Sequence, residues 1–320
     1  MDGNYSNIAL IGGTANPELA KEISNLLDIP LCSMEIKHFA DGETYVRVLE
    51  TIRGKDVFII QPTCTPVNEN LMEMLIIIDA LRRASAARIN AVIPYYGYSR
   101  QDRKDKSRVP ITAKLVANMI TEAGADRVIT VDLHADQIQG FFDIPCDRLK
   151  ALPIMADYIT THNFDLNKLT VVSPDVGSVK RSRTLARRLG VPMAIIDKRR
   201  PKQNVAEILN VIGDVKDKDV IMIDDMADTA GTLVGAAEAL KHLGANKIYA
   251  ACTHPILSGP AIERLTNSPI EKLVCTNSVP LGEEKMIDKI EVVSIAGLLA
   301  KAISRIHDGK SVSIIFDDEE

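Results

Sequence analysis

The sequence lacks the features that mark membrane-spanning, secreted or disulfide-stabilised proteins. No apolar run among its 320 residues is long enough to span a bilayer. The first residues show no basic segment followed by an apolar one, so we expect no secretory signal and no membrane association, and we predict a cytoplasmic protein. Five cysteines are present, without CxxC spacing, which argues against a disulfide framework and against a structural zinc site.

An excess of basic residues is also missing. The chain has 38 Lys and Arg against 43 Asp and Glu, a formal net charge of −5. No basic field therefore predicts binding to nucleic acid. The hydrophobic content of 46% and the charged content of 25% are those of an ordinary globular protein. The length suits two domains better than one, although no low-complexity linker divides the chain.

Apolar β-branched runs alternate with helical patterns, which predicts α/β domains with mainly parallel sheets flanked by helices. The expected strands cover residues 8–11, 57–60, 89–93, 128–131, 169–172, 193–196, 220–223 and 248–251.

The segments between the expected strands carry apolar residues at helical spacing. In one of them Leu71, Leu75, Ile78 and Leu81 share a face, and we expect the charged Glu73 and Arg83 to turn away from it. A glycine follows three of these patterns, where a left-handed helix cap favours it: Gly124, Gly190 and Gly244.

The two halves of the chain resemble each other. LLDIPL, KDVFII and LRRASAARINAVIP in the first half match RLGVPM, KDVIMI and LKHLGANKIYAACT in the second. The offsets are 162, 163 and 159 residues (27 to 189, 57 to 220 and 84 to 243). Three matches at nearly one offset favour two similar domains related by duplication. We expect an N-terminal domain over residues 1–147 and a C-terminal domain over residues 148–320.

The stretch VIMIDDMADTAGTL (220–233) places three carboxylates where an expected strand ends. The backbone N–H groups of the loop before a helix, with the positive end of the helix dipole, bind anions. Carboxylates beside that loop accept hydrogen bonds from sugar hydroxyls or face a divalent cation. A sugar phosphate with magnesium would satisfy both parts. The first-half counterpart, IQPTCTPVNEN, has no acid pair, so we expect one such site per chain.

This stretch resembles the phosphoribosyl diphosphate (PRPP) motif of phosphoribosyltransferases and PRPP synthetases. Further segments resemble the synthetases: HFADGETYV, YSRQDRKDKSRVPITAK, TVDLHADQIQGFFDIPCD, SPDVGSVKRSR and DKRRPK. The resemblance covers essentially the whole chain and implies two domains of the type I phosphoribosyltransferase-like fold. It implies a ribose-phosphate diphosphokinase of the phosphate-activated class, which transfers a diphosphoryl group from ATP to the 1-hydroxyl of ribose 5-phosphate for nucleotide biosynthesis.

For the sugar phosphate, the resemblance implies that Asp224 and Asp225 accept hydrogen bonds from the ribose hydroxyls. Either acid could assist as a general base, or a magnesium-bound alkoxide could suffice, and the sequence does not choose between them. The 5-phosphate would lie on a loop made of Asp228, Thr229, Ala230, Gly231 and Thr232.

For ATP, the resemblance implies contacts from two segments and one histidine. Phe39 offers an apolar face to adenine. In the family the loop that carries Phe39 reaches the ATP of a neighbouring subunit, so a homo-oligomer, a hexamer by resemblance, is implied. The remaining ATP contacts would be Asp41, Glu43, Arg100, Gln101, Asp102 and His134.

A magnesium cofactor and two catalytic cations are also implied. Asp132 and His134 stand at i and i+2, which puts them on one face if the strand before them persists. With Asp175 they would address the metal, although His134 equally suits a phosphate oxygen because magnesium prefers oxygen ligands. Lys198 and Arg200 would stabilise the transition state from a loop that closes over the substrates.

Regulation by inorganic phosphate and ADP is the last implication of the resemblance. The positions that match this function in the family are Arg53, Ser311 and Ser313. One departure from the family pattern stands at Ser178, where a second glycine is common. If this position needed a positive φ, serine would cost ~1 kcal/mol.

Three other interpretations were weighed. A phosphoribosyltransferase that consumes PRPP fits the acid-pair motif but not the RQD, FADGE and KRR segments. A non-catalytic synthetase subunit would have lost site residues, whereas here they are present. A generic nucleotide-binding module does not explain why acids and cations follow several strands.

Overall fold

The structure, a computed structural model, describes residues 7–162, 164–199 and 208–315. In the first half the elements are β1 (Ile8–Gly12), α1 (Pro17–Leu27), β2 (Met34–His38), β3 (Thr44–Val48), β4 (Asp56–Ile60), α2 (Val67–Arg83), β5 (Arg88–Ile93), α3 (Thr112–Ala123), β6 (Arg127–Val131), η2 (Asp136–Phe141) and β7 (Cys146–Leu149).

The second half continues with a longer series of strands. Its elements are α4 (Leu152–Thr161), β8 (Leu169–Ser173), α5 (Val179–Leu189), β9 (Met193–Arg199), β10 (Ile208–Ile212), β11 (Asp219–Ala227), α6 (Gly231–His242), β12 (Ile248–Pro255), α7 (Ala261–Asn267), β13 (Ile270–Thr276), η3 (Glu283–Lys285), β14 (Ile290–Val293), α8 (Ala296–His307) and η4 (Ser313–Ile315).

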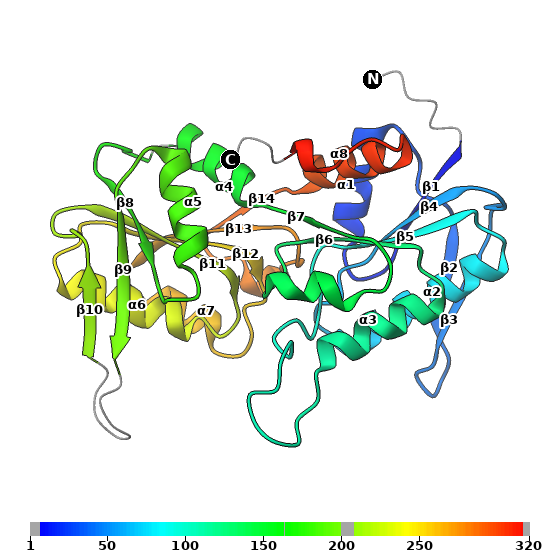
Figure 1. Ribbon diagram of the computed structural model, residues 1–320, viewed down its shortest axis with the longest axis horizontal. Helices are drawn as coiled ribbons and strands as arrows, with labels where there is room; N and C mark the ends of the chain where they lie inside the picture. Colours follow the sequence, from blue (N-terminus) through cyan, green and yellow to red (C-terminus); the bar gives the residue numbers. More distant parts are fainter. Residues whose placement is uncertain (1–6, 163, 200–207, 316–320) are drawn as a thin grey trace.

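Two helix-flanked sheets lie side by side, with a small hairpin, β2–β3, at the outer end of the first (Figure 1). The first sheet is parallel, in the order β1-β4-β5-β6-β7. The second has the order β10-β9-β8-β11-β12-β13-β14, in which β10 runs antiparallel to β9 and the other pairs are parallel. The expected α/β fold class with two similar domains is confirmed.

The strand order supports the predicted duplication. β8-β11-β12-β13-β14 in the second sheet repeats β1-β4-β5-β6-β7 of the first. In the first sheet, the position that corresponds to β9, beside β1, is occupied by a single residue: Leu31 forms an isolated parallel bridge with Leu10 of β1. The domain limit expected at residues 147 and 148 falls inside β7, whose residues pair with β6.

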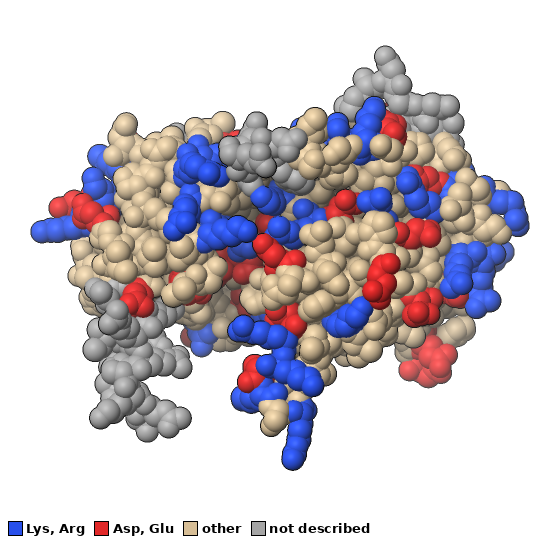
Figure 2. Space-filling view, viewed as in Figure 1, with Lys and Arg blue, Asp and Glu red and all other residues tan. Residues whose placement is uncertain are grey.

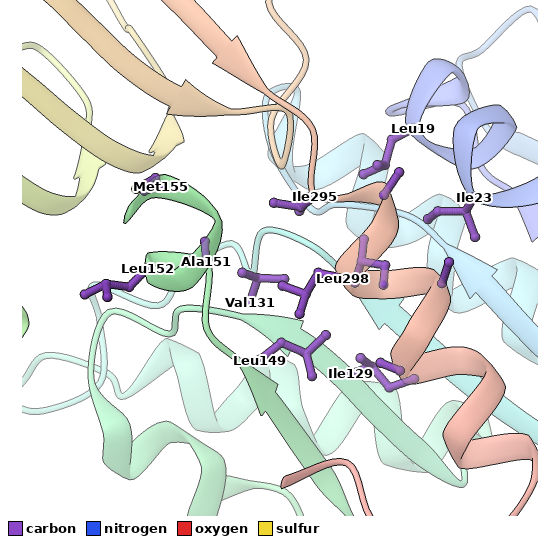
Figure 3. Close-up of a cluster of buried hydrophobic side chains, with 14 of the residues drawn as sticks. Leu19, Ile23, Ile129, Val131, Leu149, Ala151, Leu152, Met155, Ile295 and Leu298 are labelled. Atoms are coloured by element: carbon purple, nitrogen blue, oxygen red, sulfur yellow. The ribbon is translucent and has the colours of Figure 1, made fainter. Parts of the chain in front are cut away.

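A continuous apolar core joins the two sheets. It gathers residues of α1, β6, α4 and α8, so that Val131, Leu149, Met155 and Leu298 pack in one cluster (Figure 3). Two further clusters lie on the opposite faces, under α2 and α3 in the first half and under α6 and α7 in the second. Helix α8 belongs to the end of the chain but packs against α1 (Figure 1). The halves are therefore fixed against each other.

All eight expected strands are present, and the three glycines that were expected to follow helices have positive φ angles. The prediction for Glu73 was wrong. Its side chain is buried in α2, where it accepts hydrogen bonds from Thr14 N at 2.8 Å, Thr14 Oγ1 at 2.6 Å and Gln61 Nε2 at 2.8 Å. Arg83 is exposed, as expected. No helix in the described ranges has both the length and the apolar character that a membrane span requires.

Candidate active site

The site lies where the strand order of the second sheet reverses. β8 pairs with β9 on one side and with β11 on the other. Open parallel sheets bind ligands beyond the carboxyl ends of their strands at such a point. β11 ends its pairing with β8 at Met222 but stays paired with β12 as far as Ala227. Asp224 and Asp225 therefore lie within β11, in the part of the strand that extends beyond its pairing with β8, and not in the loop that follows.

Side chains from both halves hold this acid pair. His134 Nδ1, in the first half, lies 2.7 Å from Asp225 Oδ2. From the first turn of α5, Arg181 Nη1 lies 3.6 Å from Asp225 Oδ1 and 3.9 Å from Asp224 Oδ1. Ser178, just before α5, donates its hydroxyl to Asp224 Oδ1 at 3.0 Å. The pair is thus contacted from the first half on one side and from α5 on the other.

The surroundings of the two acids shift their pKa values in opposite directions. Burial raises the pKa of Asp224, and the neighbouring charge of Asp225 raises it further. Burial alone would also raise the pKa of Asp225, but the hydrogen bond with His134 and the charge of Arg181 hold it well below its usual range. The same hydrogen bond raises the pKa of His134. Asp225 is thus partnered by the His134 hydrogen bond and by the charge of Arg181, which leaves Asp224 as the acid in greater need of a donor or a cation.

The loop after β11 has the geometry of an anion site. Helix α6 begins at Gly231, after Ala230, whose φ of 56° lies in the left-handed region. The first N–H groups of a helix have no intrahelical acceptor and carry the positive end of its dipole. Arg264 Nη1 donates to Thr229 O at 2.9 Å and so fixes the loop from outside. All five residues predicted to hold the 5-phosphate border the cavity: Asp228, Thr229, Ala230, Gly231 and Thr232.

The loop between β5 and α3 reaches across to the second half. Arg100 donates from Nη1 to Asp228 Oδ2 and also borders the cavity. Asp102 accepts a hydrogen bond from Gln137 Nε2 at 2.7 Å. Gln101 joins the same loop to α3, because its carbonyl accepts a hydrogen bond from the N–H of residue 113 at the start of that helix. Of the three predicted ATP contacts in this loop, the structure brings Arg100 into the cavity wall and leaves the other two beside it.

Asp132 and His134 lie beyond the end of β6, so the condition under which they would share a strand face is not met. β6 ends one residue before Asp132, which turns the chain with a φ of 40°. Its Oδ2 accepts hydrogen bonds from Thr253 Oγ1 at 2.6 Å and Ala151 N at 3.2 Å. His254 Nε2 donates to its carbonyl at 3.0 Å. Asp132 borders the cavity but is only 8% exposed, and these contacts make it a bridge between the sheets.

Asp175 is linked to the acid pair through Ser178, which also bonds to Asp224. It follows β8, borders the cavity, and accepts a hydrogen bond from Ser178 N at 2.9 Å through Oδ1. Ser178 has a φ of −87°, so the strain considered for serine at this position does not arise. Among the described residues, no three His, Cys, Asp or Glu side chains converge as a ready-made metal site. Magnesium in phosphoryl-transfer sites takes one or two carboxylates, water and substrate phosphates, and Asp175 and Asp224 offer such oxygens.

The other predicted ATP contacts lie away from this cleft. Phe39, Asp41 and Glu43 occupy the turn of the β2–β3 hairpin, at the outer end of the first sheet (Figure 1). The Phe39 side chain is 51% exposed and packs edge-on against Tyr45, with ring centroids 5.8 Å apart. Asp41 Oδ1 accepts from Glu43 N at 3.2 Å. The structure does not bring this turn into the cavity of its own chain.

The two predicted catalytic cations are only partly described. Lys198 lies in β9, where its backbone pairs with Leu209 of β10. The Lys198 side chain and the whole of Arg200 lie outside the described residues.

The three predicted regulatory residues form two separate contacts. Arg53 Nη1 donates to Ser85 Oγ at 3.0 Å. Ser311 Oγ and Ser313 Oγ lie 2.8 Å apart, and Arg305 Nε donates to the carbonyl of Ser311. No described side-chain contact joins Arg53 to the two serines.

The cavity between the halves has a volume of about 740 Å³, which suits nucleotide-sized ligands. Acidic and basic side chains meet in the hollow between the halves (Figure 2), and a basic loop protrudes below it. Sequence reasoning missed several polar residues of its wall, although five of them stand in segments already singled out. The missed polar residues are Asp136, Gln137, Arg148, Lys150, Ser178, Lys180, Arg181 and Thr184.

Family models, relatives and a solved structure together match nearly the whole chain. Residues 8–124 match the family model described as the N-terminal domain of ribose phosphate pyrophosphokinase, and residues 172–317 match the phosphoribosyl synthetase-associated domain. A ribose-phosphate pyrophosphokinase from Clostridium perfringens is 58% identical over 99% of this chain and 100% of its own. One from Caldanaerobacter subterraneus is 60% identical over 98% and 99%. The crystal structure of phosphoribosylpyrophosphate synthetase from Mycobacterium smegmatis has a TM-score of 0.90 at 44% identity, covering 95% of this chain and 99% of that one.

Proposed function

This chain belongs to the ribose-phosphate pyrophosphokinase family, and we propose that the cavity between its halves carries out that family's reaction. The diphosphoryl group of ATP moves to the 1-hydroxyl of ribose 5-phosphate, giving AMP and 5-phosphoribosyl 1-diphosphate. One observation carries the assignment to this cavity. His134 of the first half pairs with Asp225 of the second, directly beside the anion loop at residues 228–232.

The sugar phosphate binds on the second half. Amides and hydroxyls of the loop at residues 228–232 hold the 5-phosphate, because the first turn of α6 offers unpaired donors and a positive dipole end. Asp224 and Asp225 accept hydrogen bonds from the ribose hydroxyls. This arrangement directs the 1-hydroxyl away from the phosphate loop and toward the side of the cavity formed by His134.

ATP binds from the first half. Arg100 and His134 contact phosphate oxygens, since both carry donors at the cavity wall, and phosphoryl transfer depends on positive charge around the equatorial oxygens. Lys198 and Arg200 add positive charge as the transition state forms. Gln101 and Asp102 support the Arg100 loop, and Phe39, Asp41 and Glu43 contact the ATP of a neighbouring subunit, which requires a homo-oligomer.

Magnesium supplies charge neutralisation for the transferred diphosphoryl group when it is bound. Asp175 and Asp224 are the carboxylates that would hold it together with phosphate oxygens and water. His134 Nδ1 is occupied by Asp225, so its Nε2 is the nitrogen that can address a ligand. Inorganic phosphate and ADP act as regulators near Arg53, Ser311 and Ser313, and the enzyme works in the cytoplasm.

The test is the release of AMP. Purified protein is incubated with ATP, ribose 5-phosphate and Mg²⁺, with and without inorganic phosphate, and nucleotides are separated by chromatography. We expect AMP in amounts that match the ribose 5-phosphate consumed, a higher rate with phosphate, and no AMP after Mg²⁺ is chelated. Lys198→Ala is the inactive control. If the wild-type protein releases no more AMP than Lys198→Ala, the proposed function is wrong and a non-catalytic subunit is favoured.

A further inference from the structure

The first turn of α5 contacts the acid pair at two points that no sequence motif predicted. Ser178 precedes the helix and Arg181 stands three residues later, so one helical turn brings both side chains to the same side. Helix α5 packs against β8 and β11, which carry the site. Both side chains border the cavity and are largely buried, so they can act on the acid pair and not only on solvent.

Ser178 fixes the orientation of Asp224. Its hydroxyl donates to Asp224 Oδ1 at 3.0 Å, and the N–H of Asp225 donates to the same oxygen at 2.9 Å. Two donors on one oxygen set the plane of the carboxylate and so aim the other oxygen. The Ser178 backbone is itself held, because its N–H donates to Asp175 Oδ1 at 2.9 Å. A glycine in this place would keep the backbone contact and lose the hydroxyl.

Arg181 acts on the pair from the same side as Ser178. Its Nη1 is nearer to Asp225 than to Asp224, at 3.6 Å and 3.9 Å. His134 already contacts Asp225 through the opposite oxygen, Oδ2. Asp225 therefore lies between Arg181 and His134, whereas the described hydrogen bonds on Asp224 come from the Ser178 hydroxyl and the Asp225 N–H. The two acids are held by different means and have different freedom to meet a ligand.

We propose that Ser178 and Arg181 are positioning residues for ribose 5-phosphate: Ser178 aims Asp224 at a sugar hydroxyl, and Arg181 holds Asp225 beside it. This inference rests on the proposed function of the acid pair. Because neither residue contacts ATP in this scheme, their loss weakens the use of the sugar phosphate more than the use of ATP. A residue that only stabilised α5 would affect both substrates alike.

The experiment compares variants by initial rates of AMP release, with each substrate varied in turn. Removal of one hydrogen bond to a charged acceptor is expected to raise the KM for ribose 5-phosphate by about tenfold in Ser178→Ala. The KM for ATP stays within about twofold. Arg181→Met raises the KM for ribose 5-phosphate by about tenfold or more, and Arg181→Lys recovers part of the loss because it keeps the charge.

Ser182→Ala is the matched control. Ser182 is one turn further along α5, is fully buried, and its hydroxyl has no hydrogen-bond partner in the described structure. This variant keeps both KM values. Ser178→Gly is a second variant at the same position if Ser178→Ala does not fold.

Three results would overturn the inference. They are an unchanged KM for ribose 5-phosphate in the Ser178 variants, equal changes in both KM values, and the same change in Ser182→Ala. Isothermal titration with ribose 5-phosphate alone gives an independent readout, in which the Ser178 variants bind more weakly than the wild type. Failure of the proposed function has a different signature, because the wild-type protein itself would release no AMP.

Discussion

Replacement of Thr253 by valine should weaken both the stability of the protein and its activity. The Thr253 hydroxyl donates to Asp132 Oδ2 at 2.6 Å, and the two side chains are 2% and 8% exposed. Valine keeps the shape of threonine and removes only the donor. The variant therefore isolates one hydrogen bond, which joins the end of β6 to β12 and so joins the two sheets.

The size of the effect follows from the partners that remain. After the change, Ala151 N, at 3.2 Å, is the donor to Asp132 Oδ2 that remains among the described hydrogen bonds. A lost hydrogen bond to a buried charged group costs about 2 kcal/mol. At roughly 2 °C per kcal/mol for a chain of this size, the apparent Tm should fall by about 4 °C. Asp132 also holds a positive φ two residues before His134, so relaxation there displaces His134 and lowers kcat/KM by about tenfold.

Thr130→Val is the control for this prediction. Thr130 lies in β6 and is fully buried, and its hydroxyl has no partner in the described structure. Its loss should leave the Tm unchanged or slightly higher, with normal activity. Thermal unfolding and AMP release are measured for both variants. Equal Tm values for Thr253→Val and Thr130→Val would refute the reasoning, because a partnered and an unpartnered hydroxyl would then contribute alike.

Two further predictions concern charged groups. Burial alone would raise the pKa of Asp56, but hydrogen bonds from Arg88 and His307 lower it below its usual value. Its charge therefore stabilises the fold above the ordinary aspartate pKa of about 3.9 and less as the pH falls through the lowered value. Asp56→Asn should lower the Tm at pH 7 by several degrees, with a gap that narrows near pH 3; a gap independent of pH would contradict this. Arg100 is half exposed, so Arg100→Ala should change the Tm by less than about 2 °C although its pair with Asp228 is lost. AMP release should nevertheless fall at least about tenfold, and normal activity would exclude Arg100 from the site.

Most of the strands that the sequence predicted are central and buried on both faces, which is why they read as continuous β-branched runs; β1 lies at a sheet edge but is also largely buried. β4 and β8 are fully buried along their length. Most of the missed strands lie at sheet edges or in the hairpin, where one side meets solvent and charged residues interrupt the pattern. β7 reads Cys-Asp-Arg-Leu and β14 reads Ile-Glu-Val-Val. The hydrophobic pattern of the sequence predicts a strand that is buried on both faces. An edge strand is recognised only when the strand that pairs with it is known.

Local motifs located the site, but contacts between distant segments did not follow from them. The acid pair and the anion loop could be placed because a strand, a turn and a helix follow one another in sequence. The pairing of His134 with Asp225 spans 91 positions and depends on how the two sheets meet. Asp132 shows the limit of spacing arguments: the expectation required β6 to continue, but β6 ends at Val131 and the next residue has a positive φ.

The buried Glu73 supports the expectation that the chain has one sugar-phosphate site of this kind and not two. β4 and α2 stand in the first sheet where β11 and α6 stand in the second. In the second half the crevice beyond these elements is the cavity, lined by Asp224 and residues that follow β8. In the first half Gln61 and Glu73 occupy the equivalent space, and both bond to the loop after β1. A Cβ at Gly13 in that loop would lie only 2.2 Å from Gln61 Oε1. The first half thus has a closed polar contact where the second half has a cavity, and its other strand ends contribute His134 and Arg100 to the wall of that cavity.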